Sequence, residues 1–409
     1  MSDASAVGRD TGAVEARLGK YTKSATPPSV DLREKLQVNR VERYELLASA
    51  RALFLYEGKQ AGLLYPHDWH RTAKCKHVTV AGGVGVHASR EHGSAFYSGL
   101  MNCSNVWTCP VCAAKVQERR RAEVAQAVDW AEASGIQSVM VTLTFPHYVW
   151  QKLSDLLTQQ ADALHRLRAG APWSRFKKLT GYQGLIRSLE LTLGKNGWHP
   201  HTHELWFVSS HVEAEAMKAT VLERWKSCCA KAGLLDLDNA NQVAAFDAHA
   251  VDVKGWCTAS DYLAKQDDSR HWGVDSEIAK ASTKQGRAKG KHPFGLLKLY
   301  QEGDQKAGAQ FLDYAAAMKG KRQLYWSAGL KDRVGVDDQT DEEVNEEQRD
   351  AADLLGLIDL ADWWLIRKSP QRKAKVLDLA ESNGGWVAIL QYIKSLRAKE
   401  PVLQALPEP

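Results

Sequence analysis

Three histidines at alternate positions constrain the fold of this 409-residue chain more than any other feature. They are His199, His201 and His203, and the segment that contains them, residues 197–207, is predicted to be a β-strand. Because successive side chains of a strand point to opposite faces, the three imidazoles would project from the same face. Neutral imidazole is a common ligand of transition metals, and packing alone does not explain such a row. The pattern predicts a divalent-metal site on one face of a sheet.

The segment before the histidines extends this prediction. Residues 185–193 are predicted to form a strand, and Gly-Lys-Asn-Gly at 194–197 has the composition of a hairpin turn. A two-residue loop at the centre of this turn would pair Glu190 with His201, and the same loop shifted by one residue would pair it with His203. Both registers put Glu190 on the histidine face, whereas a three-residue loop would turn it away. Glu190 is therefore a candidate third ligand, the alternative being an ordinary solvent-facing carboxylate.

The seven cysteines predict a second metal site. Their odd number argues against a disulfide framework. Cys109 and Cys112 form a C-x-x-C turn, with Cys103 and Cys75 further upstream. Thiolates at this spacing can bind one zinc ion, and four of them close a tetrahedral structural site. Three histidines of the intervening segment could replace Cys75: His77, His87 and His92.

Composition and charge narrow the class of protein. The chain is 44% hydrophobic, enough for a large core, but it has no apolar run of 18 residues and no apolar signal segment. We expect a cytoplasmic protein with no membrane partner. Residues 284–333 hold eleven Lys or Arg against four Asp or Glu, whereas residues 337–353 hold nine acidic residues and one basic. This distribution favours a polyanion-binding protein with a separate acidic segment, although two solvated faces would look the same.

The order of predicted elements indicates an α+β fold with a central antiparallel sheet and helices packed on one face. In addition to the hairpin, they are a strand at 138–145, a helix at 149–167, a helix at 212–232 and a strand at 244–253. The same patterns divide the whole chain into five predicted segments. They are a disordered tail at 1–35, an N-terminal helix and zinc-binding region at 36–113, the main domain at 114–335, an acidic linker at 336–353, and a small helical C-terminal domain at 354–400.

A run of arginines follows the cysteine cluster. Arg119, Arg120 and Arg121 lie in the first half of a helix predicted at 113–133. Together with the zinc-binding region they could form one DNA-binding surface. A solvated helix face explains the same residues equally well.

Taken in order, the motifs resemble those of rolling-circle replication initiators, the Rep proteins of small bacterial plasmids, in the HUH endonuclease superfamily. The first motif is the strand end Val141-Thr142-Leu143-Thr144, the second is His199 to His203, and the third is Tyr262-x-x-Lys265. The cysteine cluster is similar to that of the same Rep branch. Conjugative relaxases carry their tyrosine ahead of the histidines, whereas Tyr262 follows them.

This resemblance implies an HUH-like nickase domain at 114–335 that cuts single-stranded origin DNA and rejoins the displaced strand. Mg²⁺ or Mn²⁺ would be bound by His201, His203 and Glu190, with His199 as a possible further ligand. Tyr262 would attack phosphorus and form a 5′-phosphotyrosine, while Lys265 stabilises its phenolate. The released 3′-hydroxyl would prime a host polymerase, and a host helicase is a further expected partner.

Origin recognition is expected to involve duplex or hairpin DNA, in addition to the single-stranded origin DNA that is cut. The candidate phosphate contacts are Arg119, Arg120, Arg121, Lys284, Arg287, Lys289 and Lys291. Some relatives have a glutamate four residues before the tyrosine, but Thr258 stands there, so the group that ends the cycle is not visible. Two other functions are compatible with the motifs: a single-tyrosine transposase with the same metal chemistry, and a zinc-dependent DNA-binding regulator without catalysis.

Overall fold

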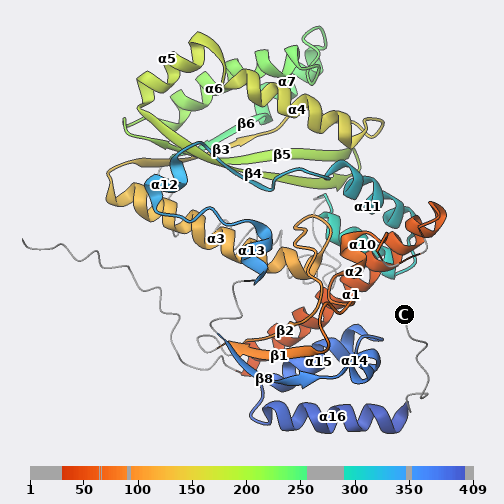
Figure 1. Ribbon diagram of the computed structural model, residues 1–409. Helices are drawn as coiled ribbons and strands as arrows, with labels where there is room; N and C mark the ends of the chain where they lie inside the picture. Colours follow the sequence, from red (N-terminus) through yellow and green to blue (C-terminus); the bar gives the residue numbers. More distant parts are fainter. Residues whose placement is uncertain are drawn as a thin grey trace, which may run out of the picture.

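The computed structural model of the chain describes residues 30–63, 65, 67–89, 94–255, 290–346 and 352–400. Within these residues the centre of the molecule is a five-stranded antiparallel sheet (Figure 1). Across the sheet the strands are β6 (Val251–Lys254), β3 (Gln137–Leu143), β5 (Gly197–Val208), β4 (Tyr182–Gly194) and β7 (Leu324–Trp326). The long β4–β5 hairpin therefore lies in the middle of the sheet and carries the histidines. The predicted α+β class with an antiparallel sheet is confirmed.

Helices cover both faces of this sheet, so the prediction of one covered face is wrong (Figure 1). One face packs against α4 (Leu153–Leu167), α5 (Gly170–Thr180), α6 (Ala214–Lys231) and α7 (Ala240–His249). The other packs against α3 (Pro110–Ala133) and α12 (Leu330–Val334). Successive β5 residues, Leu205 and Trp206, accordingly belong to different cores. Both faces are covered because this end of β5 is apolar on both sides.

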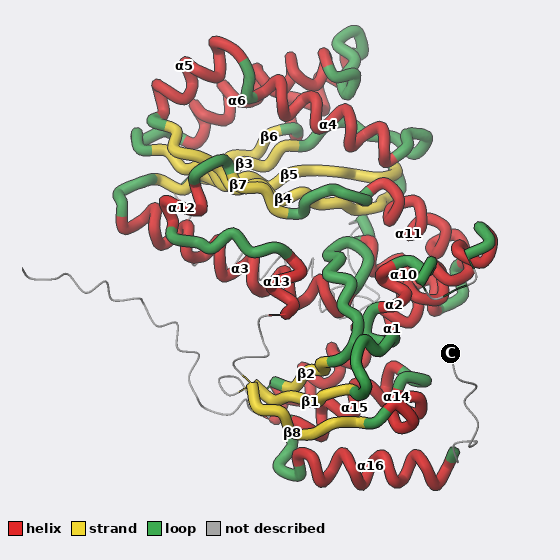
Figure 2. The backbone as a smooth tube through the Cα atoms, in the orientation of Figure 1, coloured by secondary structure: helices red, strands yellow, loops and turns green. Residues whose placement is uncertain are grey.

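A smaller sheet joins segments that are far apart in the sequence. Its strands are β2 (Ala95–Ser98), β1 (Val84–Ser89) and β8 (Ala352–Ile358), in that order and antiparallel. With it pack α1 (Val30–Gln60), α14 (Leu360–Ile366), α15 (Pro370–Ala380) and α16 (Gly385–Lys399), in the lower half of Figure 2. The cysteine region and the C-terminal segment thus share one core. The predicted domain boundaries stay predictions.

Four further helices connect the two sheets. They are α2 (Arg71–Lys74), α10 (Pro293–Gln301), α11 (Gln305–Ala317) and α13 (Asp341–Glu346). α1 contacts α15 of the smaller unit and also α10 and α11, whose Phe294 and Phe311 join the core of the main sheet. α13 lies along α3. The long helix α1 therefore ties the cysteine region to the main sheet.

Two predicted elements differ from the structure. The strand predicted at 244–253 is helical up to His249, because the Asn239 side chain caps α7 by accepting the Gln242 N–H and alanines dominate the helix. The helical region predicted from residue 354 begins as strand β8 instead. Its leucines pair with β1, a partner too distant in the sequence for a local pattern to reveal.

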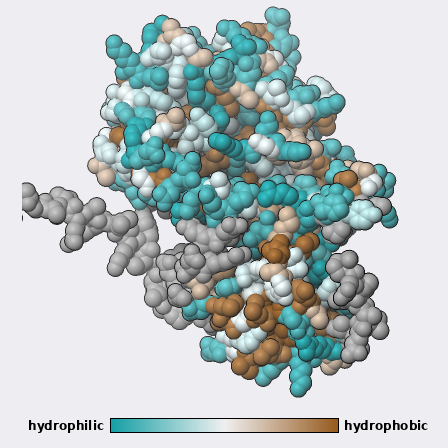
Figure 3. All heavy atoms as spheres, viewed as in Figure 1, coloured by the Kyte–Doolittle hydropathy of each residue, from teal (hydrophilic) through white to brown (hydrophobic). Residues whose placement is uncertain are grey.

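The surface differs between the two units. Figure 3 shows a mostly hydrophilic upper part and apolar side chains gathered on the lower part around β1 and β8. Exposed leucines of β8, Leu354 and Leu357, contribute to this apolar surface. None of the helices within the described ranges is long and apolar enough to cross a membrane.

Candidate metal sites

The histidines of β5 and Glu190 of β4 face one another across the central hairpin. The hairpin closes through a two-residue loop after Gly194, and its register pairs Glu190 with His201. This is the first of the two registers that the sequence allowed. Because residues two apart on a strand point the same way, His203 lies on the same face. That face is the one covered by α3 further along the strand, where Leu205 packs.

Three possible ligand atoms converge at this point. Glu190 Oε2 lies 3.4 Å from His203 Nε2 and 3.6 Å from His201 Nε2. The three atoms lie within 4.8 Å of one another. Glu190 Oε2 is buried and accepts no hydrogen bond of ordinary geometry from the residues described. Two nitrogens and one carboxylate oxygen suit a divalent cation and leave its remaining positions open for water or phosphate oxygens.

The electrostatics of the site favour cation binding. Burial disfavours the charge on Glu190, yet the imidazoles of His203 and His201 hold its pKa well below the usual range. Burial, helped by His201, lowers the pKa of His199 to about 3. At neutral pH Glu190 is therefore a carboxylate, the protonation state that a metal ligand needs, and the neighbouring His199 is a neutral imidazole.

Two threonines, Thr142 in β3 and Thr144 just after it, orient the histidine rings. Thr142 Oγ1 lies 2.9 Å from His203 Nδ1, which leaves Nε2 of that ring directed at Glu190. Thr144 Oγ1 hydrogen-bonds His199 Nε2 in the same way. His199 Nε2 is therefore engaged by Thr144, and His199 contributes none of the three converging ligand atoms. The Thr-Leu-Thr motif thus supports the histidine motif, a contact that the sequence did not reveal.

Two further histidines that the sequence reasoning missed lie next to this site. His147 stacks on His199, with ring centroids 4.3 Å apart and an interplanar angle of 10°. Burial lowers the pKa of His292 to about 4, although Glu190 is near enough to oppose this shift. The position of His147 shortly after a predicted strand could have suggested it. His292 is the N-cap residue directly before α10, and no local pattern links that helix to the hairpin.

The four predicted cysteines form one buried cluster. Cys75 Sγ lies 3.5 Å from Cys112 Sγ and 3.7 Å from Cys109 Sγ, and Cys103 Sγ lies 3.8 Å from Cys112 Sγ. A tetrahedral zinc site with Zn–S bonds of about 2.3 Å has sulfur–sulfur edges of about 3.8 Å. The cluster therefore has the dimensions of a Cys₄ metal site, and Cys75, not a histidine, is its fourth member.

The backbone around the cysteines is shaped to hold them. Cys112 N lies 3.4 Å from Cys109 Sγ and Cys103 N lies 3.5 Å from Cys75 Sγ, so amide N–H groups point at two of the sulfurs. Lys76 and Ser104, each directly after a cysteine, have positive φ angles of 51° and 50°. Such left-handed conformations are uncommon outside glycine and are retained where surrounding structure demands them. The local strain supports a cluster built for a ligand.

The arginine run is engaged in ion pairs. The Arg120 side chain is only 17% exposed and lies 2.8 Å from Glu123 and 3.0 Å from Asp341 of α13. Arg121 pairs with Glu118 of its own helix, and Arg119, which is 38% exposed, lies 3.7 Å from Glu123. Acidic residues of α3 and α13 therefore neutralise much of this surface, and its contact with DNA stays a prediction.

The remaining predicted site residues lie around the segment 256–289. Lys291 is described, and its backbone pairs with Leu193 of β4 through two hydrogen bonds of 2.8 and 2.7 Å. It is therefore beside the strand that carries Glu190. The others lie outside the described residues: Tyr262, Lys265, Lys284, Arg287 and Lys289.

Fold and sites together define an α+β protein with a buried Cys₄ cluster and an open Glu-His-His centre. Residues 100–357 match the family model Rep_1, replication protein. The chain is 27% identical over 377 residues to Protein rep of Streptomyces lividans, which covers 78% of either chain. It is also 32% identical over 149 residues to a protein of Streptomyces cyanogenus named neomycin resistance protein. That match covers 30% of this chain and 34% of the relative. No solved structure matches the chain.

The chain belongs to the Rep_1 family of replication proteins. The resemblance to plasmid Rep proteins that its motifs indicate is confirmed, and a replication protein has DNA as its partner. The matched residues include Glu190, the histidine row and three of the four clustered cysteines.

Proposed function

We propose that this replication protein initiates rolling-circle replication of a plasmid by nicking one strand of origin DNA, and that it later rejoins the displaced strand. The convergence of Glu190, His201 and His203 carries the proposal. A phosphodiester resists nucleophiles because its oxygens are negatively charged. A metal ion with open coordination positions can bind these oxygens and neutralise their charge. The central sheet would then be that of an HUH endonuclease.

Glu190, His201 and His203 would hold Mg²⁺ or Mn²⁺. Bound there, such an ion supplies positive charge that neutralises and orients the scissile phosphate. The nitrogen donors favour Mn²⁺ in vitro. Thr142 keeps His203 in the required orientation, and the carboxylate of Glu190 lowers the net charge of the complex.

In the proposed reaction the Tyr262 hydroxyl attacks phosphorus. A bond forms between the phenolic oxygen and phosphorus while the bond from phosphorus to the 3′ oxygen breaks. The phenolic proton is passed on through water to the 3′ oxygen, which leaves as a hydroxyl. The ordinary pKa of a tyrosine hydroxyl is near 10, so little phenolate forms at neutral pH. Lys265 stabilises the phenolate and thereby favours the attack. The 5′-phosphotyrosine conserves the bond energy, so rejoining needs no ATP, and the free 3′-hydroxyl serves a host polymerase.

The described flanks of the segment 256–289 support this role for Tyr262. Tyr262 follows Gly255 by seven residues, which span at most about 25 Å. β6, which ends just before Gly255, is separated from β5 only by β3, or about 10 Å. On the other side, a side chain at Gly290 would touch Thr192 of β4. Both ends of the segment are therefore tied to the sheet that bears the histidines.

We further propose that the Cys₄ cluster holds structural zinc and that the surrounding unit contacts duplex or hairpin origin DNA. The dimensions of the cluster support zinc, and its connection to the main sheet through α1 supports a shared DNA-binding role. Zinc in this position would stabilise the fold and take no part in the cleavage.

An adduct experiment tests the proposal. The protein is incubated with single-stranded DNA of either origin strand and Mn²⁺, and then analysed on a denaturing gel. We expect a covalent adduct with one strand only, its loss in Tyr262→Phe and in His203→Ala, and its retention in Tyr56→Phe, whose side chain is exposed on α1. Binding of origin DNA should survive in Tyr262→Phe.

Other results would overturn the proposal. A chain that binds origin DNA with normal affinity but never forms an adduct would be a regulator without catalysis. Adduct formation on both strands, without preference for the origin, would instead favour a transposase-like enzyme.

A further inference from the structure

The loop between β3 and α4 carries an aromatic pair beside the histidine row. The helix predicted from Val149 begins only at Leu153, so the residues before it form a loop. In this loop His147 stacks on His199, which itself stacks on His201 with centroids 4.8 Å apart. The loop is therefore an extension of the Glu-His-His site.

The loop is held in one conformation. Tyr148 N donates to Gln151 Oε1 at 2.8 Å, and Gln151 N donates back to Tyr148 O at 3.0 Å. The loop backbone also rests on Gly197, where a Cβ atom would lie 2.9 Å from both Tyr148 O and Val149 Cα. Gly197 has a φ of 92°, so glycine is required there for two reasons. The turn that sets the hairpin register thus also sets the loop.

Two aromatic rings stand on this fixed loop. Tyr148 and Trp150 are stacked, with centroids 4.6 Å apart and an interplanar angle of 10°. Trp150 is nevertheless 75% exposed, and the adjacent Val149 is 70% exposed. An indole supported on one face and open on the other is costly to expose to water, and it is preorganised to stack with a flat apolar ligand.

We infer that Tyr148 and Trp150 form a platform on which a base of the single-stranded DNA stacks next to the scissile phosphate. Trp150 is three residues from His147, so the two Cα atoms lie within about 11 Å. Bases stack on aromatic side chains whatever their identity, and this contact holds a strand while leaving its phosphates accessible. The inference rests on the proposed nickase function, because the platform would position the strand that is cut at the metal site.

Binding of short single-stranded DNA tests the platform separately from catalysis. Fluorescence anisotropy with labelled oligonucleotides is measured for Trp150→Ala, Trp150→Phe and the matched control Val149→Ala. We expect Trp150→Ala to bind roughly 5- to 100-fold more weakly, Trp150→Phe to recover most of the affinity, and Val149→Ala to bind like the unchanged protein.

An abasic substrate sharpens the test. One nucleotide near the nick site is made abasic at a time, and at one position Trp150→Ala should no longer weaken binding, because the stacked base is already absent. The platform is refuted if Trp150→Ala binds normally, if Trp150→Phe is as weak as Trp150→Ala, or if every abasic position leaves the effect unchanged. A failed nickase function would appear differently, as intact DNA binding without any adduct.

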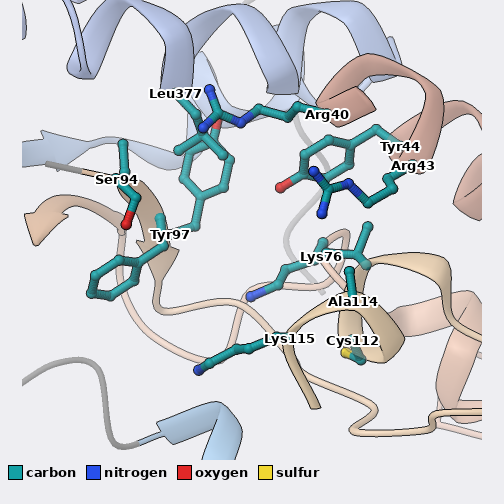
Figure 4. A pocket seen from close by; sticks show the side chains of 13 residues that line it. Arg40, Arg43, Tyr44, Lys76, Ser94, Tyr97, Cys112, Ala114, Lys115 and Leu377 are labelled. Carbon is teal, nitrogen blue, oxygen red and sulfur yellow. The ribbon is translucent and has the colours of Figure 1, made fainter. Parts of the chain in front are cut away.

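A hollow also lies beside the cysteine cluster (Figure 4). Its volume is about 260 Å³, and its walls come from α1, β2, the first turns of α3, and α15. Arg43, Lys76 and Lys115 line it from three separate segments, and Arg40 at its edge is ion-paired with Asp378 and Glu381.

Discussion

Thr142 and His203 sit opposite each other on neighbouring strands, and their side chains lie 2.9 Å apart. The hydroxyl engages Nδ1, so Nε2 is the atom left to face Glu190. The two residues belong to motifs separated by about 60 positions in the chain, and the β3–β5 pairing brings them together. This contact explains physically why a threonine stands at that position of β3.

We therefore predict that Thr142→Val weakens Mn²⁺ binding by about 10- to 100-fold while the fold is retained. Valine has nearly the same shape but cannot orient the imidazole. Isothermal titration with Mn²⁺ measures the effect, and Thr158→Val, at an exposed position of α4, is the control. Equal affinity in Thr142→Val and the unchanged protein would show that the ring needs no such support.

Glu190→Gln should abolish measurable Mn²⁺ binding, a loss of more than about 100-fold, because the amide keeps the shape but removes the charge of the ligand. The carboxylate is anionic even though it is largely buried, since His203 and His201 hold its pKa well below the usual range. Electron paramagnetic resonance of added Mn²⁺ reports free and bound ion. Glu213→Gln, on an exposed residue, should bind normally; normal binding by Glu190→Gln would remove Glu190 from the ligand set.

Removal of metal from the Cys₄ cluster should destabilise the smaller unit. We expect one zinc per chain, released by a mercurial reagent after four thiols have reacted, with a large fall in the melting temperature. Cys109→Ser should lack the zinc, whereas Cys228→Ser, in the buried part of α6, should retain it. A purified chain without zinc but with an unchanged melting temperature would contradict this assignment.

Arg120 and Arg121 should differ in their effects although they are neighbours. Arg120 pairs with Glu123, whose side chain is only 3% exposed, so Arg120→Ala should lower the free energy of unfolding by about 3 kcal/mol. Arg121 pairs with Glu118, which is 61% exposed, and Arg121→Ala should cost less than about 1 kcal/mol. Urea unfolding measures both. If Arg120→Ala is stable and only DNA binding suffers, the arginine contacts DNA rather than supporting α3.

Short-range patterns predicted the parts of the site that lie on a single hairpin. Alternation in β5 put His201 and His203 on one face, and the composition of the turn limited Glu190 to two registers, one of which is observed. The Cys₄ cluster was likewise predictable, because C-x-x-C spacing is itself a geometric constraint.

Contacts between distant segments were not predictable from one sequence. The pairing of β8 with β1 depends on a partner far away in the chain, and a leucine-rich segment is compatible with helix or strand. His147 and His292 reach the site through a loop and through α10, so neither is in register with the histidine motif. The helices on the second face of the sheet were missed although β5 becomes continuously apolar from Leu205 to Val208, a pattern typical of a strand that is covered on both faces.

Mass spectrometry of the DNA-linked peptide tests the central claim most directly. The adduct formed with origin DNA and Mn²⁺ is digested with protease and nuclease, and the modified residue is identified. The account predicts that the nucleotide is attached to Tyr262, that attachment needs Mn²⁺, and that it disappears in His203→Ala. Attachment to another residue, or an adduct that forms equally well without a divalent metal and in His203→Ala, would contradict it.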